Sequence, residues 1–292
     1  MKKLLASVLS TLFLLSGCSI LGNPQPAPED QTDSASSGAS AEVHFFDVGQ
    51  GDSEFIELPD GKTVLIDGST RSAGETVVDD IDALGYDFID YVIATHPHED
   101  HIGGLIDVLN TFDVGCIMMS NGTTTTKTFG TLLDTIDEQG IPASTLRAFS
   151  TIVEGDGYKM TCIGPEGENY DELNDYSLVT KLTVNGTSFL FTGDAEAVNE
   201  QEMLAKGVNL DADVLKVGHH GSSSSTTEEF LEAVSPEIAV ISCGADNEYG
   251  HPHDETIEKL NAANVKTYRT DLDGDIGVLV AADGSISVAT EK

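Results

Sequence analysis

The stretch FIDYVIATHPHEDHIGG, residues 88–104, places several metal-binding side chains directly after a strand-like segment. Its first half is rich in β-branched and aromatic residues, which is typical of a buried strand. In the extended loop that follows, side chains two positions apart point the same way. We therefore predict that His96 and His98 share one metal ion. Asp100 and His101 would then turn toward a second ion.

Polar side chains also follow other strand-like segments of the chain. Asp194 ends SFLFTGD, and the pair His219 and His220 ends ADVLKVGHH. Asp67 ends TVLID, and His251 lies in the later segment YGHPH. We expect these groups to join the histidine-rich loop at one site, because binding residues gather on loops held by a rigid scaffold.

The order of the predicted elements indicates one domain with two similar halves. Each half begins with meander strands and continues with alternating strands and helices. The dipeptide Asn185-Gly186, between two strand-like runs, is a strong signal for a hairpin. This order predicts two sheets that pack face to face, with helices on the outside.

The first 41 residues are expected to lie outside the folded domain. Residues 1–17 carry two lysines, a short apolar run and small residues, which is typical of a secretion signal rather than a membrane span. The segment LSGC, which ends at Cys18, resembles the lipobox of bacterial lipoproteins. That resemblance implies a lipid on this cysteine and a location at the extracellular face of the cytoplasmic membrane. Residues 18–41 are poor in apolar side chains and predict a flexible linker, so the folded domain is 42–292.

The chain is strongly acidic, with a formal net charge of −36. Removal of the signal takes away two lysines and no acid, which gives −38. Such a surface repels polyanions, so we expect no strong nucleic-acid-binding surface. Three cysteines remain in the folded domain, and their odd number favours core thiols over a disulfide framework; they are Cys116, Cys162 and Cys243.

Five motifs occur in order along the domain: FFDVGQGDSEFIELPDGKTVLIDG, THPHEDHIGG, FLFTGDAE, LKVGHHGS and YGHPH. Together they resemble the metallo-β-lactamase superfamily, most closely the hydrolase domain of DNA-uptake competence channel proteins and their free-standing secreted relatives. The likeness covers nearly all of 42–292. It implies an α/β fold with four layers, an αββα sandwich, and a two-metal site at one edge of the β layers.

Carried over motif by motif, the resemblance implies two sets of metal ligands that share one residue: His96, His98 and Asp194 for the first ion, and Asp100, His101, His220 and Asp194 for the second. Asp67 would orient ligands from behind, and His251 would lie beside them or near the substrate. Many members have a further histidine ligand before the bridging aspartate, but no histidine occurs here between residues 101 and 219. The first ion is therefore expected to have an open coordination position.

The pair of adjacent histidines leaves one assignment open. Phosphorylcholine esterases of the same superfamily also carry such a pair, which makes His219 a candidate for contacting the substrate oxyanion. Whether His219 or His220 is the metal ligand is not decided by the sequence. Asp100, Asp194 and His219 are the predicted catalytic residues.

The expected cofactors are two divalent ions, and the histidine and carboxylate ligands suit zinc, with manganese or iron as alternatives. Two such ions activate water and polarise the bond to be cleaved. The positive charge of the two ions exceeds the negative charge of the two ligand carboxylates. The positive charge that remains favours an anionic substrate. We therefore expect a hydrolase for phosphoesters. DNA is the substrate that the competence resemblance implies, but the acidic composition and the lack of any Lys/Arg-rich stretch count against it.

Two other functions remain open at this point. The superfamily fold hosts many reactions, so hydrolysis of β-lactams or lactones is an alternative. A lipoprotein that binds a metal or ligand without turnover is the second alternative. Assays with these substrates separate the three hypotheses.

Overall fold

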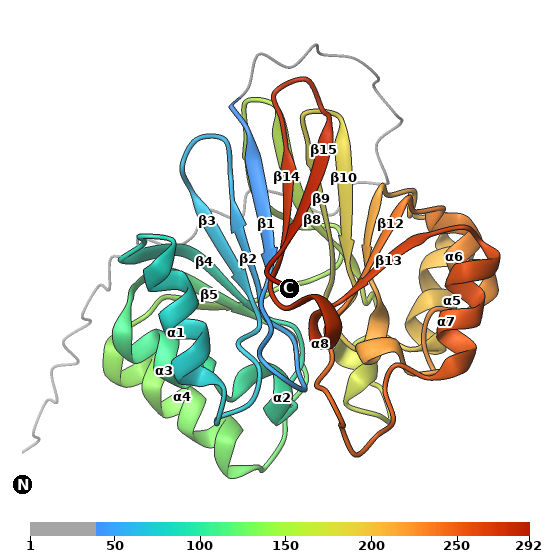
Figure 1. Ribbon diagram of the computed structural model, residues 1–292. Helices are drawn as coiled ribbons and strands as arrows, with labels where there is room; N and C mark the ends of the chain where they lie inside the picture. Colours follow the sequence, from blue (N-terminus) through green and yellow to red (C-terminus); the bar gives the residue numbers. More distant parts are fainter. Residues whose placement is uncertain (1–38) are drawn as a thin grey trace, which may run out of the picture.

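The structure is a computed structural model that describes residues 39–292 (Figure 1). Two mixed β-sheets pack face to face, and helices cover the outer face of each. The eight strands of the first sheet run in the order β15 (Ile286–Thr290), β14 (Ile276–Val280), β1 (Ala41–Phe45), β2 (Glu54–Glu57), β3 (Thr63–Ile66), β4 (Phe88–Ala94), β5 (Asp113–Met119) and β6 (Ala143–Thr145). The seven strands of the second sheet run in the order β13 (Lys266–Arg269), β12 (Ile238–Ile241), β11 (Val214–Lys216), β10 (Thr187–Phe191), β9 (Val179–Val184), β8 (Tyr158–Gly164) and β7 (Thr151–Gly155).

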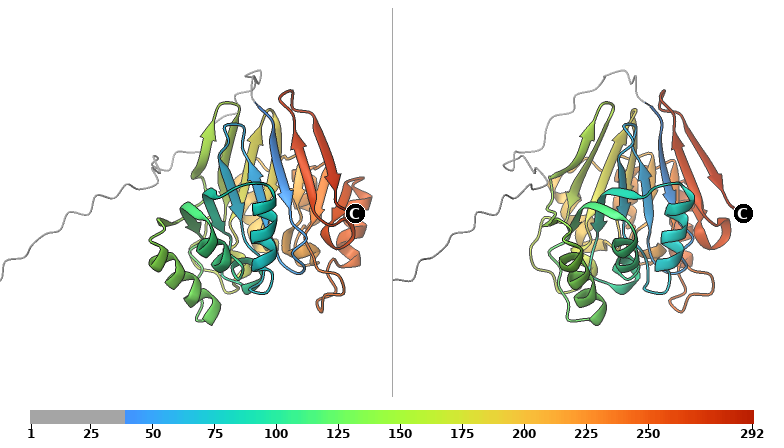
Figure 2. Two further views of the ribbon diagram at one scale, coloured as in Figure 1. Left: turned by 60° about the vertical axis from the view of Figure 1, so that its left-hand side comes forward. Right: turned by 90° about the vertical axis from the view of Figure 1, so that its left-hand side faces the viewer.

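The helices divide between the two outer faces (Figures 1 and 2). Those beside the first sheet are α1 (Gly74–Ala83), α3 (Leu105–Thr111) and α4 (Lys127–Gln139). Those beside the second sheet are α5 (Ala197–Lys206), α6 (Glu228–Val234) and α7 (Asp254–Ala262). The short elements are α2 (Glu99–Ile102), η1 (Asn174–Tyr176), η2 (Gly218–Gly221) and α8 (Thr270–Asp273). The predicted αββα sandwich is confirmed.

Three hydrophobic cores separate the four layers. Phe45, Ile56 and Phe189 belong to the core between the two sheets. Leu132 of α4 packs on the first sheet, and Phe230 of α6 packs on the second. The central strands therefore bury alternate side chains in different cores, which fixes their register, because a slip by one residue would exchange the two faces. The three cysteines are buried thiols within these cores, as predicted.

The β9–β10 hairpin confirms the strongest turn signal of the sequence. Asn185 and Gly186 have φ values of 52° and 86°, which is the left-handed pair that a type I′ turn requires. The side-chain Nδ2 of Asn185 donates a hydrogen bond to the carbonyl of Ala39, at 3.0 Å. The start of the described chain therefore lies at the hairpin end of β10, opposite the end that leads to Asp194.

The sequence did not predict where the last two strands lie. β14 and β15 return to the first sheet, where β14 pairs antiparallel with β1 and places Val43 opposite Val278. This pairing covers an edge of β1 that would otherwise expose unpaired backbone groups. The short elements β6 and α8 were also not predicted. The predicted signal and the lipidated cysteine lie outside the described residues, and no helix within the described residues is long and apolar enough to cross a membrane.

Candidate metal centre

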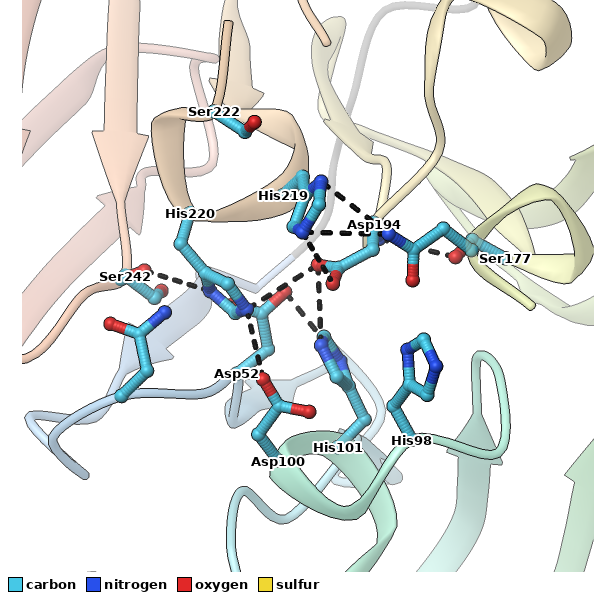
Figure 3. A network of polar contacts seen from close by, with 12 residues as sticks. Asp52, His98, Asp100, His101, Ser177, Asp194, His219, His220, Ser222 and Ser242 are labelled. Carbon is cyan, nitrogen blue, oxygen red and sulfur yellow. Dashed lines mark hydrogen bonds and ion pairs between the residues drawn. The ribbon is translucent and has the colours of Figure 1, made fainter. Parts of the chain in front are cut away.

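The loop after β4 supplies the first group of metal-binding side chains (Figure 3). Nε2 of His96 lies 3.0 Å from Nδ1 of His98 and 3.8 Å from Oδ2 of Asp194. His98 precedes α2 with extended backbone angles, φ −72° and ψ 149°, as predicted for an extended loop with the HPH spacing. Ligand atoms of all three residues lie within 4.8 Å of one another. The structure therefore brings the first predicted set together.

The second group surrounds the other oxygen of the same aspartate. Oδ1 of Asp194 lies 3.2 Å from Nε2 of His101 and 3.5 Å from Nε2 of His220. The same nitrogen of His220 lies 3.5 Å from Oδ2 of Asp100. The two oxygens of Asp194 thus face different ligand sets, which is the arrangement of a carboxylate between two ions.

Asp67 holds this centre from behind. Its fully buried carboxylate accepts hydrogen bonds from the backbone N–H and the hydroxyl of Thr95, at 2.8 and 2.6 Å. It also contacts Nδ1 of His101 at 2.7 Å. With its proton on Nδ1, His101 presents the lone pair of Nε2 to the ligand cluster. Asp67 lies behind the ligands, where the sequence placed it.

The two adjacent histidines have different surroundings. Nδ1 of His220 lies 3.0 Å from the carbonyl of Ser242, which directs Nε2 toward the ligands. Nδ1 of His219 lies 3.0 Å from Oε1 of Glu196. The side chain of His219 is 23% exposed, against 1% for His220. The geometry therefore favours His220 as the metal ligand and leaves His219 at the mouth of the site.

The backbone at this pair is strained. His219 and His220 have φ values of 50° and 55°, in the left-handed region. Consecutive left-handed residues other than glycine are uncommon, and such strain collects at functional sites. The turn directs both imidazoles toward Asp194 (Figure 3), His220 from a buried position and His219 from a partly exposed one.

The residues present fit a pair of metal ions. Among the described residues, the buried atoms without a hydrogen-bond partner include three atoms of predicted ligands: Nε2 of His101, Nε2 of His220 and Oδ1 of Asp194. A buried polar atom without a partner is costly, and here the three converge on one space. Imidazole nitrogen and carboxylate oxygen are ligands that zinc, manganese and iron accept.

The charge of the site leads to the same conclusion. Four carboxylates and one ammonium gather here: Asp52, Asp67, Asp100, Asp194 and Lys216. Burial opposes a charge on His220, but Asp194 and Asp52 outweigh burial and raise its pKa to about 10. Burial likewise opposes a charge on His101, but Asp194 and Asp67 raise its pKa well above its usual range. A site that attracts protons this strongly attracts other cations as well.

Comparisons with known proteins agree with this geometry. Residues 46–245 match the sequence profile of the metallo-beta-lactamase superfamily. The chain belongs to the metallo-β-lactamase superfamily. Members of this superfamily are generally metal-dependent hydrolases with dinuclear centres.

Two competence proteins are similar to this superfamily member. ComE operon protein 3 of Bacillus subtilis (strain 168) is 32% identical over 82% of this chain and 33% of its own length. Competence protein ComA of Neisseria gonorrhoeae is 31% identical over 90% of this chain and 34% of its own length. The chain thus spans about a third of the length of the curated relatives it matches.

Solved structures of low sequence identity share the fold. The diiron β-hydroxylase CmlA of Streptomyces venezuelae matches with a TM-score of 0.54 and 13% identity, over 84% of this chain and 55% of that chain. The metallo-β-lactamase fold protein YhfI of Bacillus subtilis matches with a TM-score of 0.52 and 11% identity, over 86% of this chain and 100% of that chain.

The metallo-β-lactamase centre opens into a pocket of about 230 Å³. Its lining combines predicted ligands with other polar side chains: Gln50, His98, Glu99, Asp100, Asn174, Asp194, His219, His220, Tyr249 and His251. His251 is thus placed beside the site, and burial together with the neighbouring histidines lowers its pKa to about 4. A larger hollow between α6 and α7 contains no comparable ligand cluster among the described residues.

The structure adds three residues that the sequence did not single out. Asp52 and Lys216 form a fully buried ion pair behind His220, at 2.8 Å. Oε1 of Gln50 accepts a hydrogen bond from the N–H of Gly244, at 3.2 Å, while its buried Nε2 has no partner among the described residues. Gln50 and Asp52 belong to the GQGD segment, which reads as a simple turn when taken alone. For Lys216, the sequence did offer a signal, because a lysine at the end of an otherwise apolar strand is unusual.

Proposed function

We propose that this chain is a dinuclear metal-dependent phosphodiesterase, held by a lipid at the extracellular face of the cytoplasmic membrane. The convergence of two ligand sets on Asp194, at the base of one pocket, carries the proposal. Bound there, two divalent ions would lower the pKa of water and polarise a phosphoryl oxygen. His96 and His98 would hold one ion, and Asp100, His101 and His220 the other.

His219 is suited to contact the substrate. Its Nδ1 faces the carboxylate of Glu196 at 3.0 Å, and its Nε2 lies 3.7 Å from Oδ2 of Asp194, beside the pocket. Because Glu196 only accepts hydrogen bonds, it stabilises a proton on Nδ1. A second proton on Nε2 would then make the ring a charged donor to a phosphoryl or leaving oxygen. Gln50 and Asn174 add amide groups to the same pocket.

The charge of the pocket favours a diester over a phosphomonoester. No lysine or arginine is among the described residues that line it. The four carboxylates and the ammonium at the centre leave three formal negative charges, which two divalent ions convert to about one positive charge. A phosphodiester group carries one negative charge, whereas a phosphomonoester carries nearly two at neutral pH.

The place where the described chain begins supports a pocket that faces away from the membrane. Ala39 lies at the hairpin end of β10, and Asp194 follows the opposite end of the same strand. A tether from a lipid on Cys18 would therefore approach the domain on the side away from the pocket. A flexible linker attached on that side would leave the pocket free to face away from the membrane.

DNA is one member of the proposed substrate class. The names of the competence relatives support it. The formal net charge of −36 weakens contact with a long polyanion. We therefore propose that the enzyme engages few phosphates at a time, as with short diesters or the end of a single strand.

The test is a substrate panel with the chain loaded with Zn²⁺ or Mn²⁺. We expect turnover of bis-p-nitrophenyl phosphate, slower turnover of p-nitrophenyl phosphate, and none of nitrocefin or an acyl lactone. Asp194→Asn is the control and should be inactive on every substrate. Rapid nitrocefin or lactone hydrolysis without phosphodiester turnover would replace the proposal with the lactamase alternative. Metal binding without any turnover would support a binding protein.

A further inference from the structure

We propose that Asp52 is the positioning residue that joins the metal ligands of the two halves of the molecule. The inference rests on the proposed metal-dependent function, because it concerns the same centre. His101 and Asp100 come from the first half, and His220 comes from the second. A dinuclear site built across two sheets needs a fixed distance between them, and Asp52 contacts both sides.

The side chain of Asp52 contacts the second half. Its Oδ1 lies 3.2 Å from Nδ1 of His220. Its Oδ2 lies 2.8 Å from Nζ of Lys216, at the end of β11. Each of these side chains is 1% exposed. One carboxylate thus pairs with a lysine on the strand that leads to η2 and lies beside the ligand that η2 carries, although its Oδ1 forms no hydrogen bond with the described residues.

The backbone of Asp52 contacts the first half. Its N–H donates to the carbonyl of Asp100 at 3.3 Å, and its carbonyl accepts from the N–H of Ser69 at 2.8 Å. The preceding Gly51 has φ 137°, and a Cβ there would lie 2.4 Å from the carbonyl oxygen of Asp100. The turn is therefore fitted directly against the loop that holds two ligands of the second ion.

The ion pair is difficult to explain by stability alone. Removing two charges from water costs several kcal/mol per ion, and apolar residues of similar volume often serve stability as well or better. Nζ of Lys216 reaches just one further acceptor among the described residues, the carbonyl of Val217 at 3.1 Å. The pair is thus costly in itself, but it keeps a full negative charge directly behind His220.

The carboxylate has a role that the carbonyl of Ser242 does not supply. That carbonyl already accepts the proton of Nδ1 at 3.0 Å and so fixes the tautomer of His220. A carboxylate next to the same nitrogen raises the basicity of the ring and strengthens Nε2 as a metal ligand. Asp52 is therefore expected to affect metal affinity more than it affects folding.

The test separates these two effects with three variants and a matched control. Asp52→Asn removes the charge at nearly constant volume, and Lys216→Met removes the counter-ion. The double variant Asp52→Asn/Lys216→Met removes the whole pair and leaves no uncompensated charge. Glu54→Gln is the control, because Glu54 is buried and interacts electrostatically with Lys216 but is not among the residues that contact His220. Zn²⁺ affinity is measured by competition with a chelator, and melting temperature is measured on the metal-free chain.

We expect Asp52→Asn to weaken one of two Zn²⁺ sites by about 10- to 100-fold. Glu54→Gln should stay within about twofold of wild type. The double variant should recover the melting temperature of the wild-type chain but keep the loss of affinity. If Asp52→Asn fails to fold, the double variant alone decides the question. Recovery of both properties in the double variant, or unchanged affinity in Asp52→Asn, would overturn the proposal.

The outcome is independent of the choice of substrate, because the readout is binding rather than turnover. A wild-type chain that binds two ions without cleaving phosphodiesters would contradict the proposed function and leave the role of Asp52 testable. Normal turnover with unchanged affinity in Asp52→Asn would contradict only the role of Asp52. The two failures are therefore distinguishable.

Discussion

At the scale of single residues, the left-handed turn at His219 and His220 divides the chemistry between neighbours. One imidazole is buried among the ligands, and the other lies at the mouth of the pocket beside Glu196. Adjacent residues of identical type can therefore be tested against each other. The comparison is informative because both substitutions remove the same group from the same turn.

We predict that His219→Ala lowers kcat for a phosphodiester by about 100-fold, which is typical for loss of one donor to a developing oxyanion. Its metal content should equal that of the wild-type chain. His220→Ala should instead lose one ion, because a ligand is missing. Kinetics combined with elemental analysis of the same samples checks both. Loss of metal in His219→Ala would show that the two assignments are reversed.

At the scale of elements, the turn between β1 and β2 sets the position of the ligand loop. Gly49 and Gly51 both have positive φ values, 74° and 137°, but their surroundings differ. A Cβ on Gly49 would meet nothing within 4 Å, whereas one on Gly51 would collide with the backbone of Asp100 and with Ser69. Substitution of Gly49 therefore tests backbone strain alone, whereas substitution of Gly51 tests strain together with displacement of the metal-ligand loop.

Gly49→Ala should lower the free energy of unfolding by about 1 kcal/mol, the usual cost of a left-handed alanine. Gly51→Ala should cost at least about 2 kcal/mol and also reduce metal occupancy, because the loop that carries Asp100 must move. Urea denaturation and metal analysis measure the two effects. Equal costs and full occupancy in both variants would contradict the placement of this turn.

Much of the fold could be predicted because the signals were local. The alternation of apolar residues, the Asn185-Gly186 turn and the polar groups after strand ends each depend on a few neighbouring residues. The return of β14 to pair with β1 was not predictable, since the pairing joins segments more than 200 residues apart and follows from an edge that needs a partner.

In the candidate site, too, the residues with a local sequence signal could be predicted, and those that depend on long-range contacts could not. Histidines and aspartates with ligand spacing could be recognised in the sequence, and the structure brings all six predicted ligands together. Asp52 and Lys216 could not be recognised, because their significance depends on a contact between residues 164 positions apart. The choice between His219 and His220 depended on backbone angles that the sequence HHGS does not specify.

At the scale of the whole molecule, negative charge accumulates beyond the metal centre. Asp80 on α1 is half-buried, and burial, Asp275 and Asp79 raise its pKa from 3.8 to about 6. A raised pKa in the folded state means that the stabilising form is the protonated one. Its contribution is complete below about pH 3.8 and is lost as the pH rises through about 6.

We therefore predict that Asp80→Asn, which mimics the protonated form, is more stable than wild type at about pH 7.5 by ~1 kcal/mol after allowing for solvent screening. The difference should shrink toward zero only near about pH 3.5, below the unfolded pKa of 3.8, and should also decrease in high salt. Denaturation of both proteins in the presence of a chelator checks this. A difference that is the same at both pH values would exclude titration of Asp80 as the cause.

The proposed function depends on two ions held around Asp194 by loops from both sheets. The most direct measurement is the number of Zn²⁺ or Mn²⁺ ions bound per chain after equilibrium dialysis, for wild type and Asp194→Ala. We expect two ions for the wild-type chain and fewer than one for the variant. A wild-type chain that binds no ion, or a variant that binds as many as wild type, would contradict this expectation.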